Sequence, residues 1–323
     1  MLITTILFFS GFVFLVKGAN LLVDGSSSLA KKYGISNLVI GLTIVAFGTS
    51  MPELIVSSVA AIKGSSGVAL GNIVGSNISN TLLILGIAAI IHPLLVKKTT
   101  VNKEIPLSLL SILAVIFLVN DMLIDGAVSN WLGKADGLVL ILFFSIFIYY
   151  TFGISRMDEG FFDSMGGEKI KKYSNAQSIG MMLMGLVGLY FGGQWLVDGA
   201  VFYARIFGLS EALIGLTIIA IGTSLPELAA SAVAAYKKQT DIAVGNVIGS
   251  NIFNLLWVLG LSSFVKPIPY DSMLNMDFLV LFVLTIFLLP LIYVGKRNIL
   301  ARREGFLLIF IYVIYLFFII KRG

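Results

Sequence analysis

The chain has 323 residues, of which 58% are hydrophobic and only 12% are charged, and its formal net charge is +5. A soluble domain has about a quarter of its residues charged, so this composition excludes a soluble globular protein. The absence of cysteine excludes disulfides and thiol chemistry, and the single histidine excludes a multi-histidine metal site. The composition therefore predicts a membrane protein, built either as a helix bundle or as a closed barrel.

The apolar segments are continuous over about 20 residues instead of alternating, which favours membrane-spanning helices over strands. We expect an all-α polytopic protein. Its ten predicted transmembrane helices cover residues 2–30, 36–62, 68–93, 104–121, 136–155, 178–206, 211–235, 242–264, 273–294 and 305–320.

The most polar connection is the segment SRMDEGFFDSMGGEKIKKYSNAQ at 155–177, which mixes both signs of charge with Gly and Ser. Such a composition is typical of a solvated linker. The linker lies near the middle of the chain, so we expect one five-helix unit over 1–154 and a second over 178–323.

The two halves carry the same motifs at one constant spacing. VIGLTIVAFGTSMPELIVSSVAA at 39–61 matches LIGLTIIAIGTSLPELAASAVAA at 213–235, and VALGNIVGSNISNTLLILG at 68–86 matches IAVGNVIGSNIFNLLWVLG at 242–260. Both matches are offset by 174 positions, as are Asp24 and Asp198, each of which is followed by Gly. We interpret each half as one structural repeat, and the two aspartates as helix-end or entrance residues.

Because each half has five helices, an odd number, the second half enters the membrane from the opposite face. The sequence therefore predicts an inverted-topology repeat, the architecture of many secondary transporters.

The basic residues predict the orientation of the helices. Fifteen of them flank the loops after helices 1, 3, 5, 7 and 9: Lys31, Lys32, Lys97, Lys98, Lys103, Arg156, Lys169, Lys171, Lys172, Lys237, Lys238, Lys296, Arg297, Arg302 and Arg303. The opposite side has six: Lys63, Lys134, Arg205, Lys266, Lys321 and Arg322. Since cytoplasmic loops carry the excess of Lys and Arg, we expect a multi-pass plasma-membrane protein with loop 155–177 cytoplasmic and both termini extracellular. The positive charge needs no nucleic-acid partner.

Two carboxylates are predicted deep inside apolar spans. Glu53 and Glu227 occupy equivalent repeat positions, whereas the other acids lie in loops or nearer to helix ends. A carboxylate at mid-bilayer costs about 3 kcal/mol on insertion scales. A structural hydrogen bond would offset part of this cost, and a bound cation would offset more.

Each glutamate directly follows a proline. Pro52 and Pro226 lack an N–H and break the helix, so we expect carbonyl oxygens in the preceding turn to lose their partners and line a cavity. The carbonyls of this turn come from Ala46 and Ala220, and Gly48 and Gly222 are expected to allow unusual dihedral angles. Hydroxyl oxygens beside the two breaks come from Thr49, Ser50, Thr223 and Ser224.

The second motif, GNIVGSNISN and its repeat, predicts the facing wall of the site. Its Ser and Asn side chains are four residues apart and share one helix face. They are Ser76 and Asn80 in the first half and Ser250 and Asn254 in the second. The G-x-x-x-G spacings at 71–75 and 245–249 favour close helix packing. Taken together, the two motifs predict four central helices around a set of oxygen ligands.

Carboxylate, hydroxyl, amide and carbonyl oxygens suit hard cations. Ca²⁺ and Na⁺ fit by size and charge, whereas Mg²⁺ gives up its water reluctantly. Two carboxylates contribute a charge of about −2, which one Ca²⁺ or several Na⁺ ions would balance. Mutually exclusive occupancy couples the two ions if only loaded states change access.

The motif pair GTSMPEL/GTSLPEL with GN(I/V)(V/I)GSNI resembles the α-repeats of the cation/Ca²⁺ exchanger superfamily, in its prokaryotic Na⁺/Ca²⁺ exchanger branch, over essentially the whole chain. The resemblance implies ten helices, with helices 2 and 7 broken at the centre, and long helices 1 and 6 that slide to alternate access. It also implies an antiporter that exchanges several Na⁺ for one Ca²⁺. The family's ligands fall on the twelve residues Ala46, Thr49, Ser50, Glu53, Ser76, Asn80, Ala220, Thr223, Ser224, Glu227, Ser250 and Asn254. K⁺-dependent relatives have Asp where this chain has Asn254, so K⁺ co-transport is not expected.

Other functions fit the sequence less well. A Ca²⁺/H⁺ or other divalent cation/H⁺ antiporter is the alternative transporter, since a glutamate also binds a proton. A cation channel would need a continuous water path, and an enzyme would need a catalytic motif that the sequence lacks. We therefore expect a transporter without a cofactor, functional as a monomer in the lipid bilayer.

Overall fold

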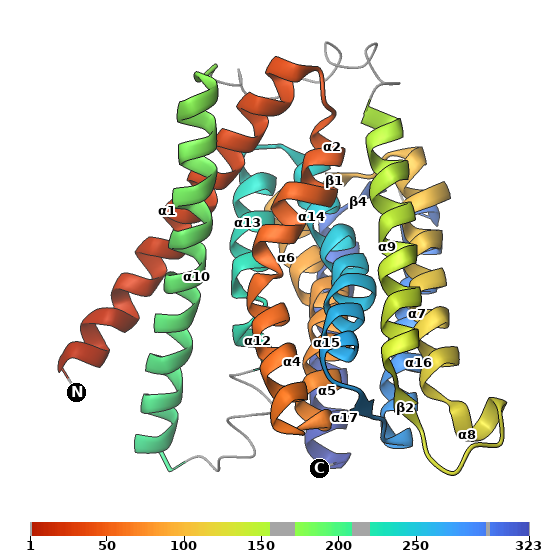
Figure 1. Cartoon of the computed structure of the whole chain (residues 1–323). Helices are drawn as coiled ribbons and strands as arrows, with labels where there is room; N and C mark the ends of the chain where they lie inside the picture. The colour runs from red at the N-terminus through yellow and green to blue at the C-terminus, as the bar shows by residue number, and fades with distance from the viewer. Residues whose placement is uncertain (1, 156–171, 209–219, 295–297, 323) are drawn as a thin grey trace.

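The chain forms a bundle of helices, shown by the computed structural model in Figure 1. The structure describes residues 2–155, 172–208, 220–294 and 298–322. Both termini lie at the same end of the bundle (Figure 1). The predicted linker, 155–177, falls mostly outside the described residues.

The first half of the chain is helical apart from two short strands. Its elements are α1 (Leu2–Tyr33), α2 (Asn37–Ile40), η1 (Gly41–Val45), α3 (Ala46–Thr49), α4 (Met51–Lys63), α5 (Ser66–Ser79), η2 (Asn80–Ile84), α6 (Leu85–Ile91), β1 (Leu94–Leu95), η3 (Thr100–Glu104), α7 (Ile105–Val119), α8 (Asp121–Ile124), β2 (Trp131–Leu132) and α9 (Lys134–Ser155). The segments η1, η2 and η3 are π-helical turns within longer helices.

The second half follows the same order. Its elements are α10 (Asn175–Ile206), α12 (Ala220–Gly222), α13 (Leu225–Tyr236), α14 (Thr240–Ile252), the π-helical η5 (Phe253–Val258), α15 (Leu259–Val265), β3 (Ile268–Pro269), the 3₁₀ turn η6 (Ser272–Leu274), α16 (Asn275–Val294), β4 (Ile299–Leu300) and α17 (Arg302–Arg322). Strand β1 pairs antiparallel with β4, and β2 pairs antiparallel with β3. The sequence did not predict these strands, which are only two residues long.

Eight helices in the described part of the chain are long and apolar enough to cross a membrane, and a bent pair makes a ninth candidate. They correspond to nine of the ten predicted helices. The first part of the remaining one, predicted at 211–235, lies outside the described residues, and α12 and α13 form the rest of it. The prediction of an all-α polytopic protein is confirmed.

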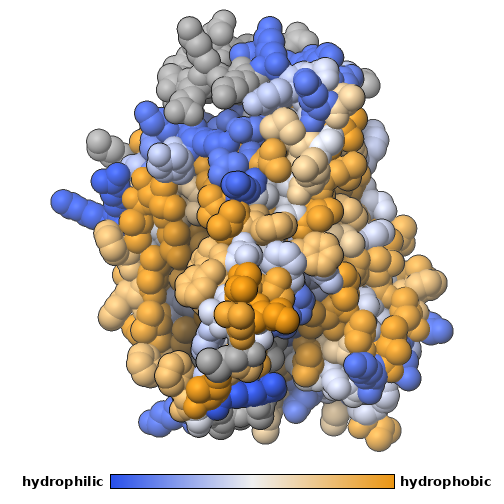
Figure 2. All heavy atoms as spheres, turned by 90° about the vertical axis from the view of Figure 1, so that its left-hand side faces the viewer, coloured by the Kyte–Doolittle hydropathy of each residue, from blue (hydrophilic) through white to orange (hydrophobic). Residues whose placement is uncertain are grey.

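The two most buried spans carry the repeated GN(I/V)(V/I)GSN motif and lie at the centre of the bundle. The α5–α6 span is 78% buried and the α14–α15 span is 94% buried, whereas α17 is only 22% buried. Figure 2 shows hydrophobic atoms across the middle of the face that α1 and α10 form, with hydrophilic atoms gathered at its upper and lower ends. The outer helices therefore present an apolar belt, and the side chains that could bind ions lie inside it.

The predicted helix breaks occur beside the two prolines. The chain bends by 45° between 37–49 and 51–63, and α4 begins with Pro52 in its first turn. Ser50 leaves the helical region there, with φ −81° and ψ 7°, and Ser224 does the same before Pro226, with φ −88° and ψ 5°. A proline ring in a helix clashes with the carbonyl four residues earlier, which explains both breaks.

The reason predicted for Gly48 and Gly222 is wrong, because neither has a positive φ. Both glycines instead allow a close approach of α10. A Cβ on Gly48 would lie 2.2 Å from Cδ2 of Leu186, and one on Gly222 would lie 2.3 Å from Cγ2 of Val197. Helix α10 therefore packs directly against the segments that precede the two breaks.

Helices α1 and α10 pack along most of their lengths through glycines spaced seven residues apart. A Cβ on Gly11 would lie 2.8 Å from the carbonyl oxygen of Gly192, and one on Gly18 would lie 2.8 Å from that of Gly185. The predicted close packing at 245–249 is also present, since a Cβ on Gly249 would lie 2.7 Å from the carbonyl oxygen of Leu42.

Candidate cation site

Glu53 and Glu227 begin the two helices that follow the breaks. Each lies in the first turn of its helix, α4 or α13, and each is fully buried. The amide end of a helix carries a partial positive charge, which stabilises a carboxylate there. Ser50, three residues before Glu53, donates a hydrogen bond to Glu227, so the two carboxylates lie in the same region. The break thus brings two like charges together in the interior of the bundle.

Hydroxyl groups connect each carboxylate to the opposite half of the chain. Ser50 Oγ donates to Glu227 Oε1 at 3.0 Å, and its repeat counterpart Ser224 lies 3.4 Å from Glu53 Oε1. Ser76 Oγ also donates to Glu53 Oε1, at 3.2 Å. Glu53 is therefore held by hydroxyl groups from both halves, and Glu227 by one from the first half.

A second pair of crossed contacts holds the threonines beside the breaks. Thr49 Oγ1 donates to Asn246 Oδ1 at 3.1 Å, and Thr223 Oγ1 donates to Asn72 Oδ1 at 3.2 Å. The amide of Asn246 in turn donates to Ser231 Oγ at 2.9 Å, and that of Asn72 donates to Ser57 Oγ at 3.0 Å. The Thr49 and Thr223 contacts are therefore repeat counterparts, as are the two amide contacts to Ser231 and Ser57.

Four asparagines form a third crossed set at the middle of α5–η2 and α14–η5. Asn80 Nδ2 donates to Asn251 Oδ1 at 3.1 Å, and Asn254 Nδ2 donates to Asn77 Oδ1 at 3.0 Å. The Nδ2 of Asn251 donates to Thr81 Oγ1 at 2.9 Å. These bonds use the nitrogens of Asn80 and Asn254 and leave their side-chain oxygens free.

Five buried oxygens around the breaks have no hydrogen-bond partner. They are Oε2 of Glu53, Oε2 of Glu227, Oδ1 of Asn80, Oδ1 of Asn254 and Oγ of Ser250. Neither glutamate pairs with a cationic side chain in the described part of the chain. A buried acceptor without a partner costs about 1–3 kcal/mol, and a buried charge costs more. These oxygens therefore match the donor set that a hard cation requires.

The expectation that the carbonyl of Ala46 loses its partners is wrong. It accepts a hydrogen bond from the backbone N–H of Ser50 at 3.0 Å and lies 3.3 Å from Thr49 Oγ1. The carbonyl opposite the ring of Pro52, four residues back, is that of Gly48. The turn that precedes Ala220 lies outside the described residues.

An open cavity of about 630 Å³ reaches one side of this region. It lies between α10 and α4, and Thr223 and Pro226 of the second break form part of its wall. Asp198 and Gln194 line it from α10. Polar groups thus extend from the cavity to the buried carboxylates.

The sequence prediction missed the asparagines that connect the two halves. Asn72 and Asn77, like their counterparts Asn246 and Asn251, lie inside the doubled GN(I/V)(V/I)GSN motif. All four are identical between the repeats and polar within an apolar span, which was a usable signal. The predicted hydroxyl and carboxylate residues that the structure brings together are Thr49, Ser50, Glu53, Ser76, Thr223, Ser224 and Glu227.

Comparisons with known proteins point to one family. The sodium/calcium exchanger protein family matches residues 3–153 and 177–321. The chain is 40% identical to a putative antiporter, CaxA, from Alkalimonas amylolytica, with 98% of both proteins covered. It is 32% identical to the sodium/calcium exchanger MaX1 from Methanosarcina acetivorans, with 95% of both covered. A solved structure of the sodium-calcium exchanger NCX_Mj, soaked with Na⁺ and Ca²⁺, superposes with a TM-score of 0.81 at 31% identity and covers 97% of both chains.

Proposed function

The chain belongs to the sodium/calcium exchanger protein family, and from that premise we propose that it is a secondary antiporter that exchanges Na⁺ for Ca²⁺ across the membrane by alternating access. The observation that carries the proposal is the set of unpartnered buried oxygens on Glu53, Glu227, Asn80 and Asn254. Ions are the substrates here, and the protein supplies the oxygens that replace their water.

The proposed architecture has ten transmembrane helices in two inverted halves, 1–154 and 178–323, with a cytoplasmic linker at 155–177. Two matched pairs of crossed hydrogen bonds support it: Thr49–Asn246 with Thr223–Asn72, and Asn80–Asn251 with Asn254–Asn77, each displaced by 174 residues. The excess of Lys and Arg at one end of the bundle supports extracellular termini in the plasma membrane. Under this orientation, the cavity beside α10 opens to the outside.

The negative charge of the site can be balanced either by Ca²⁺ or by Na⁺. No group of three or more His, Cys, Asp or Glu side chains occurs among the described residues, so two carboxylates provide the negative charge. One Ca²⁺ neutralises both of them, and so do two Na⁺ ions. Because the two kinds of ion compete for the same oxygens, a sodium gradient drives calcium transport in the opposite direction.

We propose the ligand roles that the sequence predicts for the twelve residues. Glu53 and Glu227 bind both ions, and the other ten predicted residues, including Ala46 and Ala220 through their carbonyls, complete the coordination. Asn77 and Asn251 act as positioning residues, because they hold the amide nitrogens of Asn254 and Asn80 and leave the oxygens of these two amides for the ion. All of these groups come from one chain, which supports a functional monomer.

The experiment that tests the proposal is uptake of ⁴⁵Ca²⁺ into proteoliposomes loaded with Na⁺, with K⁺, or with a proton gradient alone. We expect uptake only where an outward sodium gradient exists. Uptake driven by the proton gradient alone would make the chain a Ca²⁺/H⁺ antiporter, since both carboxylates also bind protons. Ohmic flux without any counter-ion would contradict antiport altogether.

A further inference from the structure

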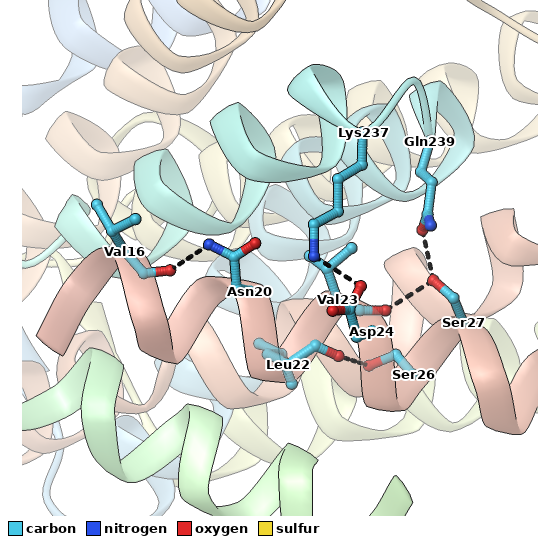
Figure 3. Close-up of polar contacts among 9 residues, drawn as sticks. All are labelled: Val16, Asn20, Leu22, Val23, Asp24, Ser26, Ser27, Lys237 and Gln239. Atoms are coloured by element: carbon cyan, nitrogen blue, oxygen red, sulfur yellow. Dashed lines mark hydrogen bonds and ion pairs between the residues drawn. The ribbon is translucent and has the colours of Figure 1, made fainter. Parts of the chain in front are cut away.

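An ion pair joins α1 to the segment that follows α13 (Figure 3). Helix α13 ends on the side of the bundle away from the two termini (Figure 1). Lys237 Nζ lies 2.6 Å from Asp24 Oδ1, and the two side chains are 15% and 36% exposed. Beside this pair, the Ser27 hydroxyl contacts the side-chain oxygen of Gln239 (Figure 3). Two polar contacts therefore hold α1 against the end of α13.

The repeat places the same two charge types at the other end of the bundle. Asp198 is 174 positions after Asp24, and Lys63 is 174 positions before Lys237. In the described part of the chain, neither Asp198 nor Lys63 belongs to an ion pair, and both are exposed. The hydrogen bond of Asp198 is local, from Gln194 Nε2 on the same helix at 3.1 Å.

The helix packing also differs between the two ends of the bundle. Helix α1 packs against α13 on the side of the Asp24–Lys237 pair. The repeat counterpart of that interface is α10 against α4, and there the open cavity separates the two helices. Pro52, Ile55 and Val56 of α4 line one wall, and Val197, Asp198 and Val201 of α10 line the other. Among the described residues, the Asp24–Lys237 pair closes one end, whereas at the other end Asp198 and Lys63 do not meet across the open cavity.

We propose that Asp24–Lys237 and Asp198–Lys63 are reciprocal ion-pair gates: each pair forms when its own end of the bundle closes and separates when that end opens. This inference rests on the alternating access proposed above. In the conformation described, Asp24–Lys237 closes one end. When α10 moves onto α4 and fills the cavity, Asp198 and Lys63 meet, and α1 separates from α13.

The two gates are unequal, which sets a resting preference. The Ser27–Gln239 contact has no polar counterpart, because position 201, equivalent to Ser27, is a valine. The end closed by Asp24 therefore has one polar contact more than the other end can form. Partly exposed ion pairs are weak, so removing one should change the ratio of the two conformations by about fivefold or less.

The first test measures that ratio with one reporter cysteine. The chain has no cysteine, so Val201→Cys in the cavity wall is a unique site for a membrane-impermeant maleimide. Under the proposal, Asp24→Asn lowers the labelling rate about two- to fivefold and Asp198→Asn raises it. Lys97→Gln is the matched control, since Lys97 pairs with Asp241 at 3.0 Å and that pair has no repeat counterpart. Equal changes in the same direction, or none in either variant, would contradict the gates.

The second test traps each conformation. Cysteine pairs at 24 and 237, or at 63 and 198, are treated with a short bifunctional thiol reagent in proteoliposomes. Either cross-link should stop exchange until reduction, and the 63–198 link should also protect the reporter cysteine at position 201 from maleimide. A 63–198 pair that never links during active exchange would overturn the proposal, as would exchange that continues with either end linked. Wild-type sodium-driven uptake is measured in parallel, so a failure of the gates is distinguished from a failure of Na⁺/Ca²⁺ exchange.

Discussion

Contacts at the centre of the molecule recur at the equivalent positions of the two repeats, whereas a contact made by the α1–α10 layer does not. At the centre, hydrogen bonds recur in pairs displaced by 174 residues, such as Ser50 with Glu227 and Ser224 with Glu53. In the α1–α10 layer, the Asp24–Lys237 contact has a sequence counterpart that is not formed. The candidate site is thus largely symmetric, although the Ser76–Glu53 bond has no counterpart at Ser250, while the contacts of the α1–α10 layer are not symmetric.

This difference separates two tasks within one fold. A symmetric site offers the same oxygens to an ion arriving from either end, so the site itself has no preferred direction. Under the proposed mechanism, the asymmetric outer layer decides which end is open. Substitutions at the central carboxylates should therefore remove exchange. Substitutions in the outer layer should alter only the ratio of the two conformations or the stability of the fold.

The largest expected effect comes from neutralising the central carboxylates. Glu53→Gln and Glu227→Gln each remove half of the negative charge that faces the ion. Because the bound Ca²⁺ then loses one of its two carboxylate partners, we expect each variant to lower sodium-driven ⁴⁵Ca²⁺ uptake by about 100-fold or more. Because the centre is symmetric, both variants should fail to a similar degree.

A buried glutamate outside the centre provides the matched control. Glu104 is fully buried and its Oε1 accepts a hydrogen bond from the Tyr150 hydroxyl at 2.8 Å. Glu104→Gln keeps an acceptor for that hydroxyl, so exchange should continue. Full transport in either central variant, with Glu104→Gln behaving the same way, would show that the site is misplaced.

Much of the centre could be predicted from the sequence, because chemistry and position coincide there. A buried carboxylate beside a proline, present twice, identified Glu53, Glu227 and the two breaks. The directions of the asparagine amides could not be predicted, since the partner of Asn80 lies 171 positions away and only the packed structure brings it close. The glycines at 48 and 222 were assigned the wrong role, because their neighbour is α10, a helix distant in the sequence.

The next effect concerns the positioning amides. Asn251→Ala removes the acceptor of Asn80 Nδ2, so the amide of Asn80 is free to rotate and its oxygen leaves the ion. The loss of one buried hydrogen bond is worth about 1–1.5 kcal/mol, which corresponds to about a tenfold rise in the KM for Ca²⁺.

The control for this prediction keeps the acceptor. Thr81→Val removes the partner of Asn251 Nδ2 but leaves Asn251 Oδ1 in place, so the KM should rise less. Asn80→Asp carries no amide nitrogen, and in that background Asn251→Ala should cost less than in the wild type. Strictly additive effects would mean that Asn251 acts only through general stability.

A smaller effect tests the contact between the symmetric centre and α10. The Cβ of Gly222→Ala would lie 2.3 Å from Cγ2 of Val197, a stiff β-branched side chain, whereas that of Gly48→Ala would meet the flexible end of Leu186. Overpacking costs about 1–3 kcal/mol, and we expect the larger part of this range at Gly222. Thermal unfolding of purified protein measures it, and Val197→Ala should restore the Tm of Gly222→Ala. A greater loss at Gly48 would contradict this ranking.

No sequence property distinguishes the open end from the closed end, because both repeats carry the aspartate and the lysine. The conformation depends on the free-energy difference between two packings of the same residues, which a motif does not encode. Position 201 is a partial exception, since a valine there in place of serine removes one polar contact from the open end.

The smallest effect is expected at an ion pair that belongs to neither gate. Lys97 Nζ lies 3.0 Å from Asp241 Oδ2 at the same end of the bundle as Lys237, and its side chain is 19% exposed. Positions 271 and 67, their repeat counterparts, are Asp and Gly, so no opposing pair exists to gain from its loss. Lys97→Gln should lower the stability by less than about 1 kcal/mol and leave both exchange and the labelling of the Val201→Cys reporter unchanged. A shift in labelling as large as that of Asp24→Asn would mean that any charge at this end biases the conformation, and the special role of the repeated pair would be lost.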